Sequence, residues 1–106
     1  MIVVLESPYH FNCDKEHNMH MLYLCACLDD SLKRGESPFA SHGLYTLCLD
    51  DNNPQERELG ISAGLEFYKV SEKCVVYVDH GISTGMERGI ERAKELGVPV
   101  EYRRML

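Results

Sequence analysis

The sequence lacks the features that would assign it to a membrane, secreted or repetitive class of protein. No apolar run approaches the roughly 20 residues that a membrane-spanning helix needs. The start of the chain, residues 1–6, has neither the basic residues nor the cleavage site of a signal peptide. Repeats, linkers and low-complexity segments are also absent. We therefore expect a single domain over residues 1–106 that is cytoplasmic and makes no membrane contact.

Basic residues are too few for a protein that binds a nucleic-acid polymer. Eleven Lys and Arg residues face 17 Asp and Glu residues, which leaves a net charge of −6. Broad contact with a phosphate backbone needs a basic stripe, so we expect no nucleic-acid polymer as partner. A small nucleotide remains compatible with this charge, because a single pocket can be locally positive.

Metal-binding and disulfide patterns are missing as well. The five cysteines include no CxxC pair, since Cys25 and Cys27 are separated by one residue. His17 and His20 lie three residues apart and have no partner motif. We expect reduced thiols, no metal and no cofactor.

Strand-like and helix-like patterns alternate along the chain. Apolar runs predict strands at residues 2–5, 38–40, 74–78 and 98–102. Spacings of three and four between apolar residues predict helices at residues 14–34, 54–71 and 84–96. Residues 44–49 fit either a short helix or an extended segment. The alternation predicts an α/β fold, a small three-layer Rossmann-like (flavodoxin-like) parallel sheet of about four strands flanked by helices.

The helical patterns also predict which residues are buried and where two helices begin. In the first helix the expected buried stripe is Met21, Leu24, Cys25, Leu28 and Leu32. In the second helix it is Leu59, Ala63, Phe67 and Val70. Asn53, followed by Pro54, and Ser83 are the expected N-caps of the second and third helices. Pro99 predicts an edge position or a first-residue position for the last strand.

A ligand site is expected where the carboxyl ends of the strands meet. Three segments converge there, at residues 6–9, 40–43 and 79–87. In residues 81–90 the small side chains allow close backbone approach, and the helix N-terminus favours an anion such as a 5′-phosphate. Glu87 lies in the first helical turn, where the helix dipole favours its ionised form. It is either a nucleophile or oxocarbenium-stabilising group, or an ordinary acidic residue that stabilises the helix.

Three parts of the chain carry a resemblance that covers nearly its whole length. Gly85-Met86-Glu87-Arg88-Gly89, followed by residues 97–100, is similar to the nucleophile segment of the nucleoside 2-deoxyribosyltransferases and of the deoxynucleoside 5′-monophosphate N-glycosidases. Residues 4–9 resemble the first strand and sugar-pocket loop of that superfamily. Residues 38–42, 49–51 and 56–61 resemble a compact uncharacterised subgroup of it that is frequent in phages and bacteria.

The resemblance implies cleavage of the N-glycosidic bond of a nucleoside or nucleotide, or transfer of its deoxyribosyl group. Glu87 would attack C1′ and expel the base, and a second base or water would then release the sugar. Asp79 would hold or protonate the base. The residues implied in substrate binding are Ser7, Pro8, Tyr9, His42, Gly81, Ser83 and Gly85. The small-molecule partner is a nucleoside or nucleotide, and relatives often complete the site with a second subunit, which implies a homo-oligomer (a dimer or higher).

Several positions depart from the family pattern or allow a second interpretation. Glu6 stands where the group usually has a small residue, and Ala63 and Gly64 stand where the transferases have acids that contact the base. His42 either contacts a phosphate or acts as an acid, or it is a surface-loop histidine. Arg57 either pairs with a phosphate or is a solvated helix charge. The alternative function is therefore a non-catalytic protein, such as one encoded by a phage, that senses or sequesters a nucleotide.

Overall fold

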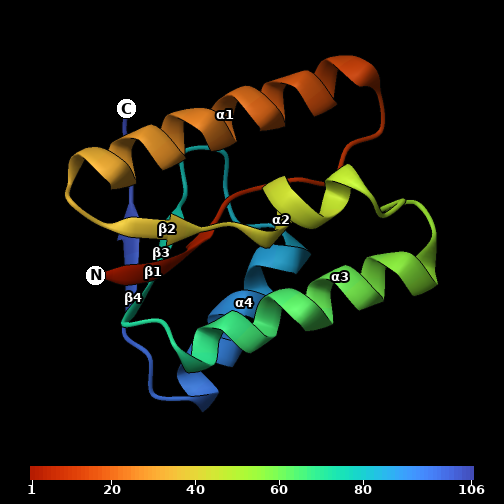
Figure 1. The fold of residues 1–106 in the computed structure, drawn as a ribbon. Coiled ribbons are helices and arrows are strands. Elements are labelled where there is room, and N and C mark those ends of the chain that lie inside the picture. Colours follow the sequence, from red (N-terminus) through yellow and green to blue (C-terminus); the bar gives the residue numbers. More distant parts are fainter.

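The computed structural model describes residues 1–106 as a parallel sheet between two layers of helices (Figure 1). The strands, in the sheet order β2-β1-β3-β4, are β1 (Ile2–Glu6), β2 (Ser37–Phe39), β3 (Lys73–Tyr77) and β4 (Val100–Arg103). The α-helices are α1 (Asp14–Lys33), α2 (Ser41–Leu44), α3 (Pro54–Glu66) and α4 (Thr84–Glu95). Short 3₁₀ helices η1 (Tyr45–Leu47) and η2 (Phe67–Lys69) continue α2 and α3. The predicted α/β architecture is confirmed.

Strand β1 supplies both hydrophobic cores, because successive residues of a strand point to opposite faces of the sheet. Val3 and Leu5 pack on the α1 side, where the core also contains Tyr23, Leu24, Cys27, Val75 and Tyr77. Val4 packs on the other side, where the core also contains Tyr68, Cys74, Val76, Met86, Ile90 and Ala93. The same alternation directs Glu6, the last residue of β1, toward the α4 side.

Helix α1 buries only part of the stripe that apolar spacing predicts. Leu24 is buried, and Met21 and Leu28 are partly buried against the core, but Cys25 and Leu32 are exposed. Tyr23 and Ser31 are buried instead, and each directs its hydroxyl to a carboxylate: that of Tyr23 to Asp79 and that of Ser31 to Glu36. The expectation was wrong at Cys25 and Leu32 because it counted only apolar residues, whereas a satisfied hydroxyl is also buried at low cost.

Helix α3 also ends earlier and faces differently than expected. It ends at Glu66, Leu59 is 61% exposed, and Val70 lies beyond η2 and is exposed. The inward positions are instead Gly64 and Tyr68, which lie four residues apart. A Cβ on Gly64 would lie 2.6 Å from the Cβ of Ser41, so glycine allows α3 to approach α2 closely.

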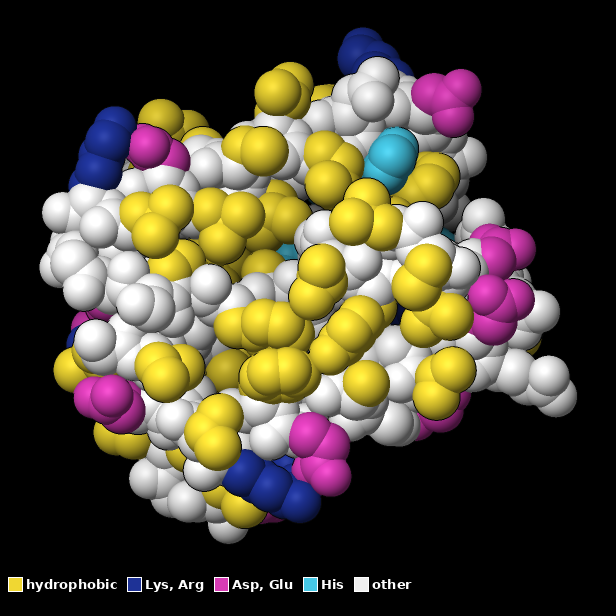
Figure 2. Space-filling view, viewed as in Figure 1, with side chains coloured by type: hydrophobic (Ala, Val, Ile, Leu, Met, Phe, Trp, Pro, Cys, Tyr) yellow, Lys and Arg dark blue, Asp and Glu magenta, His cyan; other side chains and the backbone are white.

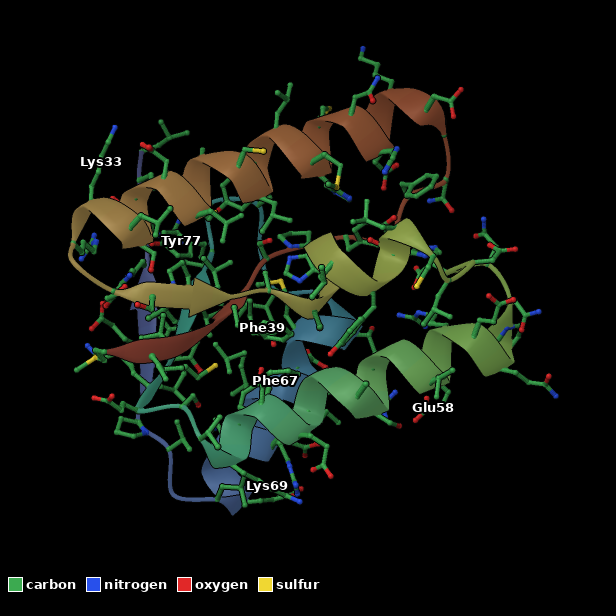
Figure 3. The ribbon with its side chains drawn as sticks, viewed as in Figure 1. Lys33, Phe39, Glu58, Phe67, Lys69 and Tyr77 are labelled. Atoms are coloured by element: carbon green, nitrogen blue, oxygen red, sulfur yellow. The ribbon has the colours of Figure 1, made fainter.

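The outer side of this region is apolar. Phe67 stacks on Phe39 with ring centroids 3.9 Å apart, and both rings lie between α3 and β2 (Figure 3). Figure 2 shows hydrophobic side chains gathered on this face of the molecule. The exposed apolar residues of α2, η1 and α3 are Leu44, Leu47 and Leu59.

Side-chain caps fix the starts of α3 and α4, as expected. The Asn53 side-chain oxygen accepts hydrogen bonds from the amides of Gln55 and Glu56, at 3.0 and 3.2 Å. The Ser83 hydroxyl oxygen accepts one from the Met86 amide at 3.2 Å. Residues 44–49, which fitted two alternatives, are mainly helical. β4 is an edge strand that begins just after Pro99.

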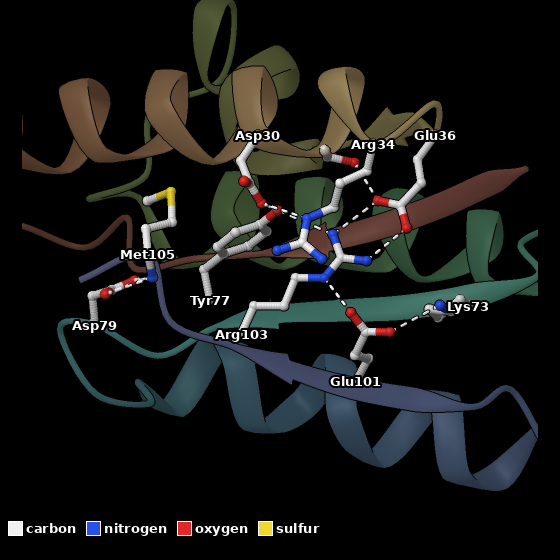
Figure 4. A network of polar contacts seen from close by, with 10 residues as sticks. Asp30, Arg34, Glu36, Lys73, Tyr77, Asp79, Glu101, Arg103 and Met105 are labelled. Atoms are coloured by element: carbon white, nitrogen blue, oxygen red, sulfur yellow. Dashed lines mark hydrogen bonds and ion pairs between the residues drawn. The ribbon is translucent and has the colours of Figure 1, made fainter.

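A buried ionic network ties β4 to the loop after α1 (Figure 4). The Arg103 guanidinium donates to both carboxylate oxygens of Glu36, at 2.6 and 2.8 Å, and to the Tyr77 hydroxyl at 3.1 Å. The hydrogen bonds from Arg103 lower the pKa of Glu36 to about 2. The network lies away from the cavity described below and holds the sheet edge. No helix in the structure combines the length and the apolarity that crossing a membrane requires.

Candidate functional site

A cavity of about 230 Å³ opens at the carboxyl end of β1, between α2, α3 and the start of α4. At this point the strand order reverses: β2 lies on one side of β1 and β3 on the other, so the chain leaves β1 toward one edge of the sheet and later returns on the other side. Ligands of open parallel sheets bind at this type of position. The cavity is therefore the candidate functional site.

Glu6 contributes a carboxyl group to the wall of this cavity. Its side chain is half-buried, and the Tyr68 hydroxyl donates a hydrogen bond to its Oε2 atom. None of the ion pairs in the structure includes Glu6. Burial raises the pKa of Glu6 to about 8, and the Tyr68 hydrogen bond offsets only part of that effect. At neutral pH the group is therefore mainly the neutral acid.

Gly89 creates the space that the Glu6 carboxyl group occupies. A Cβ atom on Gly89 would overlap both the Glu6 carboxyl group and the Tyr68 hydroxyl. Gly89 is buried on the inner side of α4, and Tyr68 is 1% exposed. The buried Tyr68 ring cannot move far, so its contact requires glycine at position 89.

A hydroxyl–imidazole pair forms another part of the wall. Ser7 Oγ and His42 Nε2 are 2.7 Å apart, and which of the two donates depends on the histidine tautomer. Burial lowers the pKa of His42 to about 4, so the imidazole is neutral at pH 7. The Thr46 hydroxyl donates to the His42 carbonyl oxygen at 2.6 Å, and this bond helps to fix the segment that carries the histidine.

The rim of the cavity carries charged groups. Arg57 Nε lies 3.7 Å from a carboxylate oxygen of Asp51, and His10 Nδ1 lies 3.9 Å from the other oxygen. The Arg57 guanidinium also reaches the start of α4. Its Nη2 atom lies 3.9 Å from the position that a Cβ atom on Gly85 would occupy. A cationic side chain and a helix N-terminus thus lie at the same edge, where both favour an anion.

The structure brings together part of the site predicted from the sequence. The predicted residues that line the cavity are Ser7, Tyr9, His42, Ser83 and Gly85. The predicted residues outside its lining are Pro8, Asp79, Gly81 and Glu87. No group of three or more His, Cys, Asp or Glu side chains is arranged to hold a metal ion.

Glu87 does not face the cavity. Its side chain is exposed and makes no hydrogen bond or ion pair, because Met86 and Gly89 take the inward positions of this turn of α4. The neighbouring Arg88 makes a two-pronged ion pair with Glu58 of α3, with both N–O distances at 2.9 Å. The predicted role of Glu87 as nucleophile is therefore not supported by its position.

Asp79 holds the end of the chain instead of facing a ligand. Its carboxylate accepts a hydrogen bond from the Met105 amide at 2.9 Å (Figure 4). It also accepts hydrogen bonds from the Tyr23 hydroxyl at 2.6 Å and from the Leu106 amide at 3.0 Å. Burial alone would raise the pKa of Asp79, but these hydrogen bonds outweigh it and lower the pKa. The predicted contact of Asp79 with a base is therefore not supported by the geometry.

The sequence interpretation placed Glu6 in a segment that converges on the site but gave it no role, and it gave none to Tyr68 or Gly89. Glu6 alternates with Val4 along β1, and this alternation indicates that it shares a face with α4. Tyr68 follows Gly64 by four residues, which places both on one helix face. Nothing in the sequence indicated that Gly89 would lie against Glu6.

The fold and the cavity define a small parallel α/β protein with a cavity at the carboxyl end of its sheet. The model of a domain of unknown function, DUF7768, matches residues 1–103, and the chain belongs to this family. The structure is similar to that of a 2-deoxyribosyltransferase from the psychrotolerant bacterium Bacillus psychrosaccharolyticus, with a TM-score of 0.67 and 21% identity. The match covers 98% of this chain and 72% of that chain, and shows a shared fold. No curated protein matches the sequence significantly.

Proposed function

We propose that the cavity binds a nucleoside or nucleotide, and that the protein cleaves its N-glycosidic bond or transfers its deoxyribosyl group. The observation that carries this proposal is a carboxyl group, that of Glu6, in a cavity shared with the Ser7–His42 pair and the start of α4. The fold shared with a 2-deoxyribosyltransferase supports the same class of substrate.

Each part of the cavity matches one part of such a substrate. Tyr9 and Tyr45 offer ring faces and edges to a base or sugar, and the Ser7–His42 pair offers a donor and an acceptor to sugar hydroxyls. Arg57 and the α4 N-terminus suit a 5′-phosphate. The volume of about 230 Å³ lies below the usual 300–1,000 Å³ of ligand pockets, which favours a small metabolite.

The reaction is assisted by a carboxyl group, because breaking the C1′–N bond leaves positive charge on the sugar and negative charge on the base. A carboxylic acid that donates a proton to the leaving group, or a carboxylate that stabilises the sugar, lowers this barrier. The cavity holds such a group in Glu6, whereas the resemblance proposed Glu87.

The proposal is tested by incubating the purified protein with a panel of deoxynucleosides and their 5′-monophosphates. Chromatography is expected to detect free base for at least one substrate, and transfer is detected by adding a second base. Absence of base release over the whole panel would contradict enzymatic cleavage.

The second candidate function is binding without chemistry, in which a phage-encoded or bacterial protein senses or sequesters a nucleotide. The exposed position of Glu87 favours it, because the residue that the family pattern assigns to catalysis lies outside the cavity. Saturable binding of a nucleotide in calorimetry, without any turnover, would support this alternative over the first.

We also propose that the chain forms a homo-oligomer, a dimer or higher. Leu44, Leu47 and Leu59 are exposed, and Figure 2 shows hydrophobic side chains gathered on one face of the molecule, which supports an interface with a second copy. Sedimentation at micromolar concentration is expected to show a species larger than the monomer, and a monomer alone would contradict the proposal.

A further inference from the structure

The Glu6 carboxyl group is held by three elements and remains open to the cavity. It lies at the end of β1, Tyr68 of η2 donates to its Oε2 atom, and Gly89 of α4 leaves room for it. Its Oε1 atom makes no hydrogen bond within the chain, and Glu6 lines the cavity. One oxygen is therefore fixed by the protein while the other is free for a ligand.

From this geometry we infer that Glu6 is the catalytic acid of the site, which delivers a proton to the leaving base. The inference rests on the function proposed above and assigns to Glu6 the step that the sequence resemblance assigned to Asp79. Asp79 cannot supply this proton from its observed position, because its carboxylate is bound to the Tyr23 hydroxyl and to the last backbone amides of the chain.

The charges around Glu6 favour its protonated form. The titratable groups in contact with it are Tyr68 from η2 and Cys74 from β3, both uncharged at neutral pH. His42 from α2 lines the same cavity, as do the carboxyl groups of Asp51 and of Glu56 from α3. Arg57 of α3 lies at the rim and interacts with Asp51, and α4 brings no charged side chain to this wall. Burial without a cationic partner favours the protonated form of a carboxyl group, which is the state that a proton donor requires.

The step balances with water as the only co-reactant. The Glu6 O–H transfers its proton to a ring nitrogen of the base while the C1′–N bond breaks, and the bonding electron pair leaves with the base. Water then forms a bond to C1′ of the oxocarbenium-like sugar and returns a proton to the Glu6 carboxylate. The net reaction is nucleoside plus water to free base plus sugar, and Glu6 is restored.

The test compares Glu6→Gln with the parent protein on two substrates, a purine deoxynucleoside and its N7-methylated form. The methylated base already carries a positive charge, so it leaves as a neutral molecule without needing a proton. We expect Glu6→Gln to lose at least a hundredfold in kcat on the unmethylated substrate, with KM nearly unchanged, and only a few fold on the methylated one. The activity of the parent protein should fall at alkaline pH, where Glu6 loses its proton, and this fall should occur only with the unmethylated substrate.

Controls separate this inference from a folding defect and from the rival assignment. Glu91→Gln, an exposed position on α4, should keep the parent rates on both substrates. Glu87→Gln tests the nucleophile implied by the resemblance, whose loss would slow both substrates equally. An infrared carboxylic-acid band near pH 6 that disappears in Glu6→Gln reports the protonated state without any activity.

The possible outcomes are distinct. Equal losses of Glu6→Gln on the two substrates, or no loss on either, would overturn Glu6 as the proton donor while leaving N-glycosidic cleavage in place. No base release by the parent protein would overturn the proposed function itself. Absence of the infrared band would overturn the protonated state on which the inference depends.

Discussion

Replacement of Glu6 by Gln should change how the stability of the protein depends on pH. Glutamine has nearly the same shape and keeps an oxygen that accepts the Tyr68 hydrogen bond, but it cannot ionise. The pKa of Glu6 is 4.5 in an exposed state and about 8 in the folded protein. Between these two values the folded state retains a proton that the unfolded state has lost, so stability falls as pH rises through this range.

The size of the effect follows from the shift. One pKa unit corresponds to about 1.4 kcal/mol, so Glu6 ionisation should cost about 2 kcal/mol between pH 6.5 and pH 8. Below pH 6.5 His42 opposes this trend, because its folded-state pKa is about 4 and its stabilising contribution is lost as the pH falls. The window from pH 6.5 to pH 8 therefore isolates Glu6 from His42, and water in the open cavity makes 2 kcal/mol an upper value.

Urea unfolding at half-unit steps from pH 6 to pH 8.5 measures this dependence. The parent protein should lose stability across the window, whereas Glu6→Gln should have a flatter profile and be the more stable protein near pH 8. Glu91→Gln, an exposed change of the same chemistry, should follow the parent. Parallel profiles for the parent and Glu6→Gln would refute the reasoning that burial keeps the Glu6 carboxyl group protonated.

Two further substitutions test the packing around the site and the ionic network at the sheet edge. Gly89→Ala should destabilise the protein by about 1–3 kcal/mol in urea unfolding, because its methyl group would overlap Glu6 and Tyr68. Arg103→Met should destabilise it by about 3–5 kcal/mol, because the buried Glu36 carboxylate would lose its cationic partner. The loss of stability caused by Arg103→Met should become smaller at acidic pH, because Glu36 is then protonated and needs no cationic partner.

Each of these changes has a matched control in the same element or next to it. Gly85→Ala, at the start of the same helix as Gly89, meets no atom closer than 3.9 Å and should be tolerated in the same unfolding assay. Arg104→Ala, at an exposed position, should change stability by no more than about 0.5 kcal/mol. Equal effects of the two glycine changes would show that helix α4 is sensitive to any added methyl group, which would contradict the specific contact with Glu6.

Much of the fold could be predicted from the sequence, because local patterns determine it. The apolar runs at residues 2–5 and 74–78 form the two central strands, and the caps Asn53 and Ser83 begin their helices. Parallel strands present their carboxyl ends at one edge of the sheet, and Ser7 and His42, which follow two neighbouring strands, line one cavity there.

Only the tertiary structure decided which side of each helix is buried and that the carboxyl group of Glu6, not that of Glu87, reaches the cavity. In α3 the inward side carries Gly64, because a helix can approach its neighbour most closely where it has no side chain, and Tyr68 of η2 continues that side. In α4 the inward position is Gly89, so Glu87 faces away and Glu6 of β1 fills the space. Sequence motifs identify acidic residues, but the direction and protonation of a carboxyl group depend on neighbours that are distant in the chain.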